Sequence, residues 1–226
     1  MAVLPMFPLG TVLFPGEVLP LHVFEPRYRQ LVQDCLVGVP EFGVVLIERG
    51  SEVGGGDARH EVATVAKVAQ VAELPDGRYA IMVVGDRRVR VVDWLADDPY
   101  PRAEVESLGG SIADIDVDGP PTSDPDRRVL ARLRRVLALA TEAGYEAPAA
   151  TSELSEQPDL ACYQAAALAP FGPHDKYLLL AAADTSERFA LLDGLLEGAE
   201  AVLRFELNPP DVADDEGDDD GERGPR

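Results

Sequence analysis

The chain has 226 residues, of which 46% are hydrophobic and 27% are charged, and its formal net charge at pH 7 is −21. This composition is ordinary for a globular protein with one large domain or two small ones, and the negative charge argues against nucleic-acid and membrane partners. No run of about 18 apolar residues and no signal-peptide pattern is found, so we expect a cytoplasmic protein without a membrane span.

Short apolar runs punctuated by proline fill the first thirty residues, with prolines at positions 5, 8, 15, 20 and 26. Proline fixes φ and lacks a backbone N–H, so it favours strand ends, sheet edges and turns. We therefore expect one or two short strands over residues 1–21, followed by a helix that opens near Pro26 and ends at Gly38 and Pro40. The apolar face of this helix consists of Tyr28, Leu31, Val32 and Cys35.

The next segment is rich in β-branched residues. We expect strands at 42–47, 62–74, 79–84 and 100–106, and another around residues 88–92 whose wet face carries Arg88 and Arg90. Asp76-Gly77 predicts a tight hairpin turn, and Gly85-Asp86 predicts a second turn or a bulge. The glycine-rich residues 50–59 predict a flexible loop. Many short strands separated by turns favour a barrel or a folded sheet.

The second half reads as helical. We expect a β-rich part at 1–108, a linker at 109–122, a helical part at 123–207 and a disordered acidic tail at 208–226. Within the helical part, we predict a helix that is capped by Ser123 and ends at Gly144, and two short helices over 159–168 and 173–183. The last predicted helix, 185–207, opens with the capping box Asp184–Glu187. Its buried stripe is Phe189, Leu192, Leu196, Ala199 and Leu203.

The ordered succession of these motifs resembles one known family. The N-terminal motifs are Met6-Phe-Pro-Leu9, Val12-Leu-Phe-Pro-Gly16 and Leu19-Pro-Leu-His-Val-Phe-Glu-Pro-Arg-Tyr28. They are followed by Phe42-Gly-Val-Val-Leu46, Thr64-Val-Ala66, Asp76-Gly-Arg-Tyr79, Gly85-Asp-Arg-Arg88, Asp175-Lys-Tyr-Leu-Leu-Leu180 and Ser186-Glu-Arg-Phe-Ala-Leu-Leu192. Over residues 2–205 the chain resembles the N-terminal, substrate-binding domain of the Lon protease family.

The resemblance implies an α+β fold, in which a PUA-like twisted β pseudo-barrel is followed by a C-terminal helical bundle. It also implies recognition of unfolded or partner polypeptides in protein quality control, with a protease as a further partner. The chain contains no G-x-x-x-x-G-K-[ST] loop and ends before an ATPase or a Ser-Lys proteolytic domain could begin. We therefore expect a non-catalytic, stand-alone bacterial binding module without a cofactor, and the sequence leaves its oligomeric state open.

The predicted peptide-binding residues lie in the first apolar turn. Val12, Leu13, Phe14 and Pro15 are apolar residues at a predicted surface turn near the 50–60 loop, so we expect extended peptide to bind there. The run Phe24, Glu25, Pro26, Arg27 and Tyr28 has a structural interpretation, with direct ligand contact as the alternative. Phe24 and Tyr28 would pack the sheet onto the helix, Glu25 would accept helix N–H bonds, and Arg27 or Arg29 would pair with carboxylates.

Other chemistry finds little support in the sequence. Cys35 and Cys162 lie on apolar helix faces, and the three histidines are scattered singly, so neither a catalytic thiol nor a metal site is predicted. The acidic cluster in the tail reads as solvated charge. An arginine-rich helix (Arg127, Arg128, Arg132, Arg134 and Arg135) reads as a wet face, with docking of the acidic tail as the alternative. A PUA-like RNA-binding protein and a hydrolase with an unrecognised site remain the alternative functions.

Overall fold

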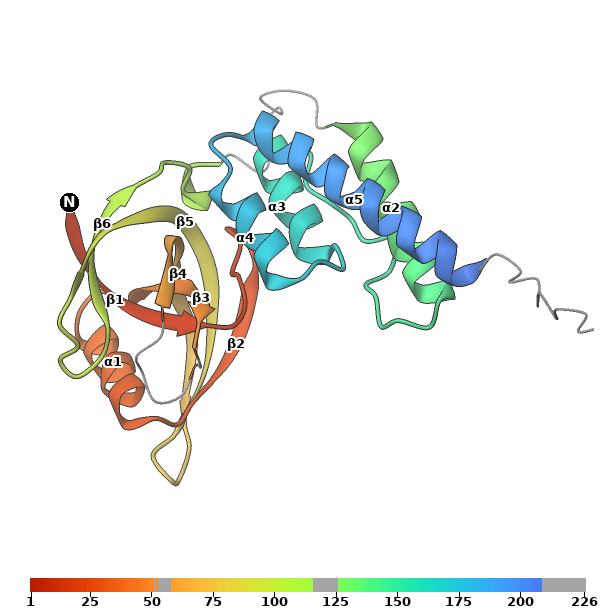
Figure 1. The fold of residues 1–226 in the computed structure, drawn as a ribbon. Helices are drawn as coiled ribbons and strands as arrows, with labels where there is room; N and C mark the ends of the chain where they lie inside the picture. Colours follow the sequence, from red (N-terminus) through yellow and green to blue (C-terminus); the bar gives the residue numbers. More distant parts are fainter. Residues whose placement is uncertain (51, 53–57, 116–125, 209–226) are drawn as a thin grey trace, which may run out of the picture.

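The computed structural model describes residues 1–50, 52, 58–115 and 126–208, and it has an α+β fold. Figure 1 shows a strongly curved sheet with one helix beside it in the N-terminal part, and a group of helices in the C-terminal part. The strands are β1 (Ala2–Leu9), β2 (Val18–Val23), β3 (Glu41–Arg49), β4 (Ala58–Glu73), β5 (Tyr79–Leu95) and β6 (Arg102–Ser107). The helices are α1 (Pro26–Val37), the 3-10 turn η1 (Ile112–Asp114), α2 (Arg127–Glu142), α3 (Pro158–Leu168), α4 (Pro173–Ala181) and α5 (Thr185–Leu207).

The sheet closes on itself. Its strand order is β2-β5-β4-β3-β1-β6, and β5 also pairs with β6. Five strands therefore form a ring, while β2 lies outside the ring and pairs with the first half of β5. The β1–β3 pair is parallel and the other pairs are antiparallel. This arrangement confirms the predicted twisted pseudo-barrel followed by helices.

Strand β5 is longer than the sequence predicts. Residues 79–84 and 88–92 were expected to be separate strands, but they form one continuous strand that bends at Gly85. Opposite β4, Val65 pairs with Arg87 and Ala66 pairs with Gly85, so Asp86 is the extra residue of a β-bulge. Of the two predictions at Gly85-Asp86, the bulge is therefore confirmed and the turn is wrong. The bend lets one strand pair first with β2 and then with β6.

The helix boundaries follow the predicted signals closely. Helix α1 begins at Pro26 and is followed by Gly38, and α5 spans Thr185–Leu207 as expected. The predicted cap Ser123 lies outside the described residues. Helix α2 is instead capped by Asp126, whose side chain accepts hydrogen bonds from the backbone N–H groups of Arg128 and Val129. Asp184 caps α5 in the same way, by accepting from the Glu187 backbone N–H.

The two parts of the molecule share a hydrophobic core. Val12, Phe14, Leu46 and Val62 from the β-rich part belong to the same buried cluster as the apolar residues of α2–α5. The ring of Phe14 lies 6.1 Å from the ring of Tyr163 in α3, measured between centroids. A second cluster joins α1 to the sheet and includes Phe7, Tyr28 and Phe42. The helices therefore pack on the sheet as well as on each other.

Arg88 is not on a wet face, which corrects the sequence prediction. Arg88 is only 7% exposed. Its guanidinium group donates to the backbone oxygens of Leu180 (2.8 Å), Ala182 (2.5 Å) and Ala183 (3.4 Å) at the end of α4. The outer face of β5 is covered by the helical part at this position. Two residues further along the same strand, Arg90 is exposed as predicted and pairs with Glu106.

The predicted division of the chain is only partly covered by the described residues. The linker prediction at 109–122 includes η1, whereas residues 116–122 lie outside the description, as does the acidic tail after Asn208. The boundaries at 108 and 123 stay predictions. Within the described residues, no helix combines the length and the apolar character that a membrane crossing needs.

Candidate functional site

A small groove on the β-rich part brings together β1, β2 and the start of α1. We call it the β2–α1 groove. Its volume is about 180 Å³. The lining residues are Phe7, Leu9, Pro20, Leu21, His22, Val23, Phe24, Glu25, Tyr28 and Glu52. Most of these residues are apolar, and all except Glu52 come from elements that the proline-punctuated N-terminus builds.

The floor of the groove is rigid and apolar. Phe7, Leu9, Val23 and Tyr28 are each at most 7% exposed. The rings of Phe7 and Tyr28 stack with 4.2 Å between centroids and 17° between planes, and Phe7 also contacts Phe42. Aromatic pairs of this kind add to the stabilisation that burial alone provides. A ligand would therefore meet a preformed surface rather than a mobile one.

The rim combines one exposed aromatic ring with a fixed set of charges. Phe24 is 54% exposed, although it immediately precedes the cap of α1. Arg27 donates from Nε to Glu25 Oε2 at 3.1 Å and stacks its guanidinium 4.5 Å from the Tyr28 ring centroid. Glu52 accepts a hydrogen bond from the Gly10 backbone N–H. Glu25 therefore pairs with Arg27, and the Glu52 carboxylate is bonded to the backbone of Gly10. Phe24 is the exposed apolar side chain at this rim.

Strand β2 presents an unpaired edge beside this groove. Gly85 N donates to Glu17 O at 2.9 Å, so Glu17 faces β5 through its backbone. In an antiparallel pair the direction alternates, so the backbone groups of Val18, Pro20 and His22 point away from β5. Proline fits at an outward position because it has no N–H to leave unpaired. Among the described residues, β2 has a hydrogen-bonded strand neighbour on one edge only.

Comparison with known proteins identifies the family. The family model described as "ATP-dependent protease La (LON) substrate-binding domain" matches residues 3–198. The chain belongs to this family.

The relatives and solved structures agree with this assignment. The Lon protease of Anaeromyxobacter dehalogenans (strain 2CP-C) is 31% identical over 69% of this chain, and Lon protease 2 of Myxococcus xanthus is 28% identical over 90% of it. The chain spans only 18% and 24% of these two relatives. The crystal structure of a Lon N-terminal domain protein from Xanthomonas campestris is 26% identical, with a TM-score of 0.63 over 87% of this chain and 98% of that one.

The turn that carries the predicted peptide-binding residues is buried in this Lon-family domain. Val12, Leu13 and Phe14 are 5%, 1% and 1% exposed, and Pro15 is buried beside them. The turn faces α3 and the helical core instead of solvent. The predicted exposure is therefore wrong, and direct peptide contact by these side chains stays a prediction that would require the turn to open.

The run from Phe24 to Tyr28 differs from its structural interpretation at two residues. Tyr28 packs sheet against helix as predicted, whereas Phe24 projects to the surface. Glu25 makes no side-chain hydrogen bond to the helix N–H groups and pairs with Arg27 instead. Sequence reasoning missed the contributions of Leu9, Leu21 and Glu52 to the groove. The available signal was Pro20, because a proline in the middle of a strand indicates an edge.

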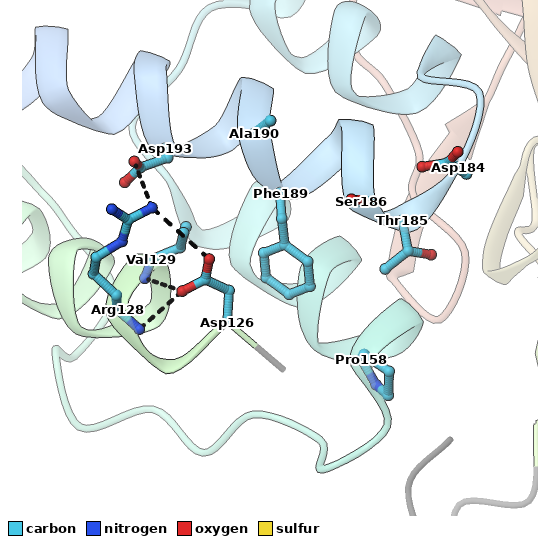
Figure 2. Close-up of a pocket in the computed structure, with 10 residues that line it drawn as sticks. All are labelled: Asp126, Arg128, Val129, Pro158, Asp184, Thr185, Ser186, Phe189, Ala190 and Asp193. Atoms are coloured by element: carbon cyan, nitrogen blue, oxygen red, sulfur yellow. Dashed lines mark hydrogen bonds and ion pairs between the residues drawn. The ribbon is translucent and has the colours of Figure 1, made fainter. Parts of the chain in front are cut away.

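A larger cavity, of about 760 Å³, lies elsewhere, at the N-terminal ends of α2 and α5. Figure 2 shows Phe189 projecting into it, with Asp126 and Asp193 both linked to Arg128. Asp126 and Asp184 cap helices, and Asp193 Oδ1 also lies 3.0 Å from Arg132 Nη1. Because these carboxylates already serve helix ends and ion pairs, we do not assign this cavity a function.

The arginine-rich face of α2 is largely occupied by α5. Arg128, Arg132 and Arg135 pair with Asp193, Glu197 and Glu200. This pairing goes beyond the predicted solvated face, since it joins two helices. The tail, which the alternative interpretation placed on these arginines, lies outside the described residues.

Both cysteines are buried, and we predict that neither reacts in the folded protein. Burial raises the pKa of Cys35 to about 11, with Asp34 and Glu41 adding to the shift, and burial raises that of Cys162 to about 12. Hardly any thiolate is then present at pH 8. We expect no reaction with a thiol reagent in the native protein. After denaturant is added, two equivalents of the reagent should react per chain, one with each cysteine. Rapid modification of one thiol in the native protein would contradict this.

Proposed function

We propose that this chain is a non-catalytic receptor that binds extended, apolar segments of unfolded polypeptides. The segment would pair with the free edge of β2 and place an apolar side chain against Phe24 and the β2–α1 groove. Membership in the Lon substrate-binding family supports a protein ligand. The observation that carries this proposal is the exposed Phe24 beside an unpaired strand edge.

An extended ligand suits this geometry for two reasons. Backbone groups of an incoming strand can satisfy those of Val18, Pro20 and His22, which gives affinity with little dependence on sequence. The groove is small, with a volume of about 180 Å³, so we expect it to take one side chain at a time. A receptor for varied unfolded clients needs this combination of general backbone pairing and loose apolar preference.

The chain's charge adds a selection against acidic clients. The formal net charge is −21, and Glu25 and Glu52 lie at the rim of the groove. We expect segments with flanking lysine or arginine to associate faster than segments with flanking aspartate or glutamate, and the difference to shrink as salt is added. Because ordering a disordered segment costs free energy, the affinity for a single short segment is expected to be modest.

Replacing Phe24 with alanine tests the groove. We expect Phe24→Ala to weaken the binding of a labelled, alternating apolar peptide about tenfold, because an exposed aromatic anchor contributes on the order of 1–2 kcal/mol. Fluorescence anisotropy gives the Kd. Tyr145→Ala is the matched control, since Tyr145 is also an aromatic residue with 54% exposure but lies after α2. Equal losses in the two variants would remove the groove from the proposal.

A second comparison tests the edge of β2 with the protein unchanged. N-methylation at alternate backbone positions of the same peptide removes its N–H donors and keeps its side chains. We expect the methylated peptide to lose most of its affinity. If both peptides bind equally well, the contact does not use strand pairing. Low-salt binding of an RNA oligonucleotide, or turnover of generic esters by the purified chain, would instead favour one of the alternative functions.

A further inference from the structure

Helix α5 carries a second apolar face that nothing in the described part of the molecule covers. Its buried side consists of Phe189, Leu192, Leu196 and Leu203 and packs against α2, α3 and α4. On a different side, Leu191 is 36% exposed, Val202 is 58% exposed and Phe205 is 62% exposed. Residues 191, 195, 198, 202 and 205 follow one another at spacings of three or four, so they share one helix face. Leu195 lies at the edge of this face and is partly buried against the helical core. No charged residue occupies this face between its ends.

Gly194 and Gly198 lie in the middle of this face, although no contact with the described residues requires a glycine at either position. A Cβ added at Gly194 or at Gly198 would meet no atom within 4 Å. Glycine in a helix interior is less favourable than alanine, so two of them on one face are a cost to the isolated fold. Glycine at such a position allows another backbone to approach closely. Together with the exposed Leu191, Val202 and Phe205, this indicates a partner helix outside the chain.

The face is complementary to itself in an antiparallel arrangement. Phe205 lies seven residues after Gly198, and Leu191 lies seven before it, while Val202 and Gly194 lie four residues to either side. When two copies of α5 cross antiparallel at Gly198, each Phe205 reaches Leu191 of the other copy, and each Val202 lies over the small Gly194. Large side chains meet small ones, and the axes come closest where both copies have glycine.

The composition of residues 209–226 argues against this segment as the occupant of the face. Residues 209–226 contain eight acidic residues and, apart from prolines and glycines, only Val212 and Ala213 as apolar ones. Such a segment cannot bury an uncharged apolar face. Two copies that each carry a net charge of −21 can approach closely only on a face without acidic side chains, and this face meets that requirement.

We propose that the exposed face of α5, formed by Leu191, Gly194, Gly198, Val202 and Phe205, is a homodimer interface in which two copies of α5 pack antiparallel about Gly198. A helix pair of this length buries on the order of 1,000 Å² in total, which is at the lower end for specific interfaces. The dimer is therefore weak, and it forms at roughly 10–100 µM protein. Added salt strengthens it, because salt screens the repulsion between two acidic chains.

Sedimentation equilibrium of the full chain over a range of protein and salt concentrations tests this interface. We expect a reversible monomer–dimer equilibrium that Val202→Asp weakens by at least about tenfold, because a charge would be buried at the contact. Val37→Asp is the matched control, since Val37 is 91% exposed at the end of α1, and it should leave the equilibrium unchanged. A chain that stays monomeric throughout, or a dimer that Val202→Asp does not affect, overturns the proposal.

Gly198→Ala separates the interface from the fold. In the monomer the new methyl group meets nothing, so the melting temperature should rise by about 2–4 °C. In the dimer two methyl groups meet at the closest approach of the helices, so dimerisation should weaken. Gly198→Cys gives a direct readout, because mild copper-catalysed air oxidation should link two copies, whereas Glu197→Cys, one residue along and turned away, should not. A lack of cross-linking at Gly198→Cys, or dimerisation that Gly198→Ala strengthens, contradicts the antiparallel register.

Discussion

Replacing Arg88 with methionine is expected to lower the free energy of unfolding by about 3–4 kcal/mol, because buried acceptors would lose their donor. Arg88 Nη1 donates to both Leu180 O and Ala182 O, and Nη2 donates to Ala183 O. These carbonyl groups lie in the last turn of α4 and just after it, where a helix has no internal donors left. Methionine keeps much of the aliphatic volume of arginine, so the loss reports on the hydrogen bonds and the charge.

A second buried arginine, Arg188, donates to the same end of α4. The contact between the β-rich part and the helices therefore depends on two guanidinium groups. Arg188 of α5 is 1% exposed and donates from Nε to Leu179 O at 2.9 Å, and its guanidinium lies 4.3 Å from the Tyr163 ring centroid. Burial is the main reason why the pKa of Arg88 is lowered, while Tyr163 counteracts the shift and Arg188 adds to it. Two positive groups thus face the negative end of the α4 dipole. Arg88 from strand β5 and Arg188 from helix α5 therefore donate hydrogen bonds to the same end of α4.

Arg90→Met provides the control for Arg88→Met. Arg90 lies on the same strand and face, but its side chain is 50% exposed and pairs with Glu106 at the surface. Surface pairs contribute little, so a change below about 0.5 kcal/mol is expected. Chemical denaturation followed by circular dichroism measures both variants. Arg88→Lys should fall between Arg88→Met and the wild type, because one ammonium group cannot reproduce the planar fork. Equal stability of Arg88→Met and Arg90→Met would show that the junction does not depend on Arg88.

Local patterns in the sequence were sufficient for most of the helices and for the fold class. Pro26 and Gly38 bound α1, and the acidic cap at Asp184 starts α5, because these signals act within one turn of the chain. Periodicity also identified the buried stripe of α5. The pairing of β5 with β2 at one end and with β6 at the other was not predictable from local sequence, since it depends on a bulge and on residues far apart in the chain.

The candidate site shows the same limit at the level of single side chains. Phe14 directly precedes Pro15, and Phe24 lies two residues before Pro26, in the same proline-punctuated part of the chain. The sequence alone assigned surface exposure to Phe14 and packing to Phe24. The structure reverses the two assignments, with 1% exposure for Phe14 and 54% for Phe24. The difference arises because α3 packs onto the turn at residues 10–17, which is a contact between segments about 150 residues apart. Arg88 became buried for a similar reason.

Among the described glycines, Gly85 is expected to tolerate an added methyl group least, and Gly85→Ala should lower the free energy of unfolding by at least about 3 kcal/mol. An added Cβ would lie 2.2 Å from the Phe14 carbonyl oxygen and 2.9 Å from the Phe14 carbonyl carbon. Both are backbone atoms, so no side-chain rotation can relieve the overlap. The β-bulge at Asp86 brings the two segments into this close contact.

We call the turn at residues 10–17 the Phe14 turn. It has little freedom to move away from Gly85. Gly16 N donates to Gly85 O at 2.8 Å, and Gly85 N donates to Glu17 O at 2.9 Å. Glu17 in turn accepts from Phe14 N through Oε2 at 2.8 Å. The Phe14 ring is also fixed in the core that the helices share with the sheet. A shift large enough to admit the methyl group would break several of these contacts together.

Gly172→Ala is the control for this prediction, because its added Cβ meets nothing within 4 Å and its φ of −68° suits any residue. We expect its free energy of unfolding to stay within about 1 kcal/mol of the wild-type value. Since the Phe14 turn links the free edge of β2 to the helical core, Gly85→Ala should also weaken peptide binding, whereas Gly172→Ala should not. Wild-type stability for Gly85→Ala would show that the turn and the bulge are not locked together, and the β2 edge would then lose its fixed support.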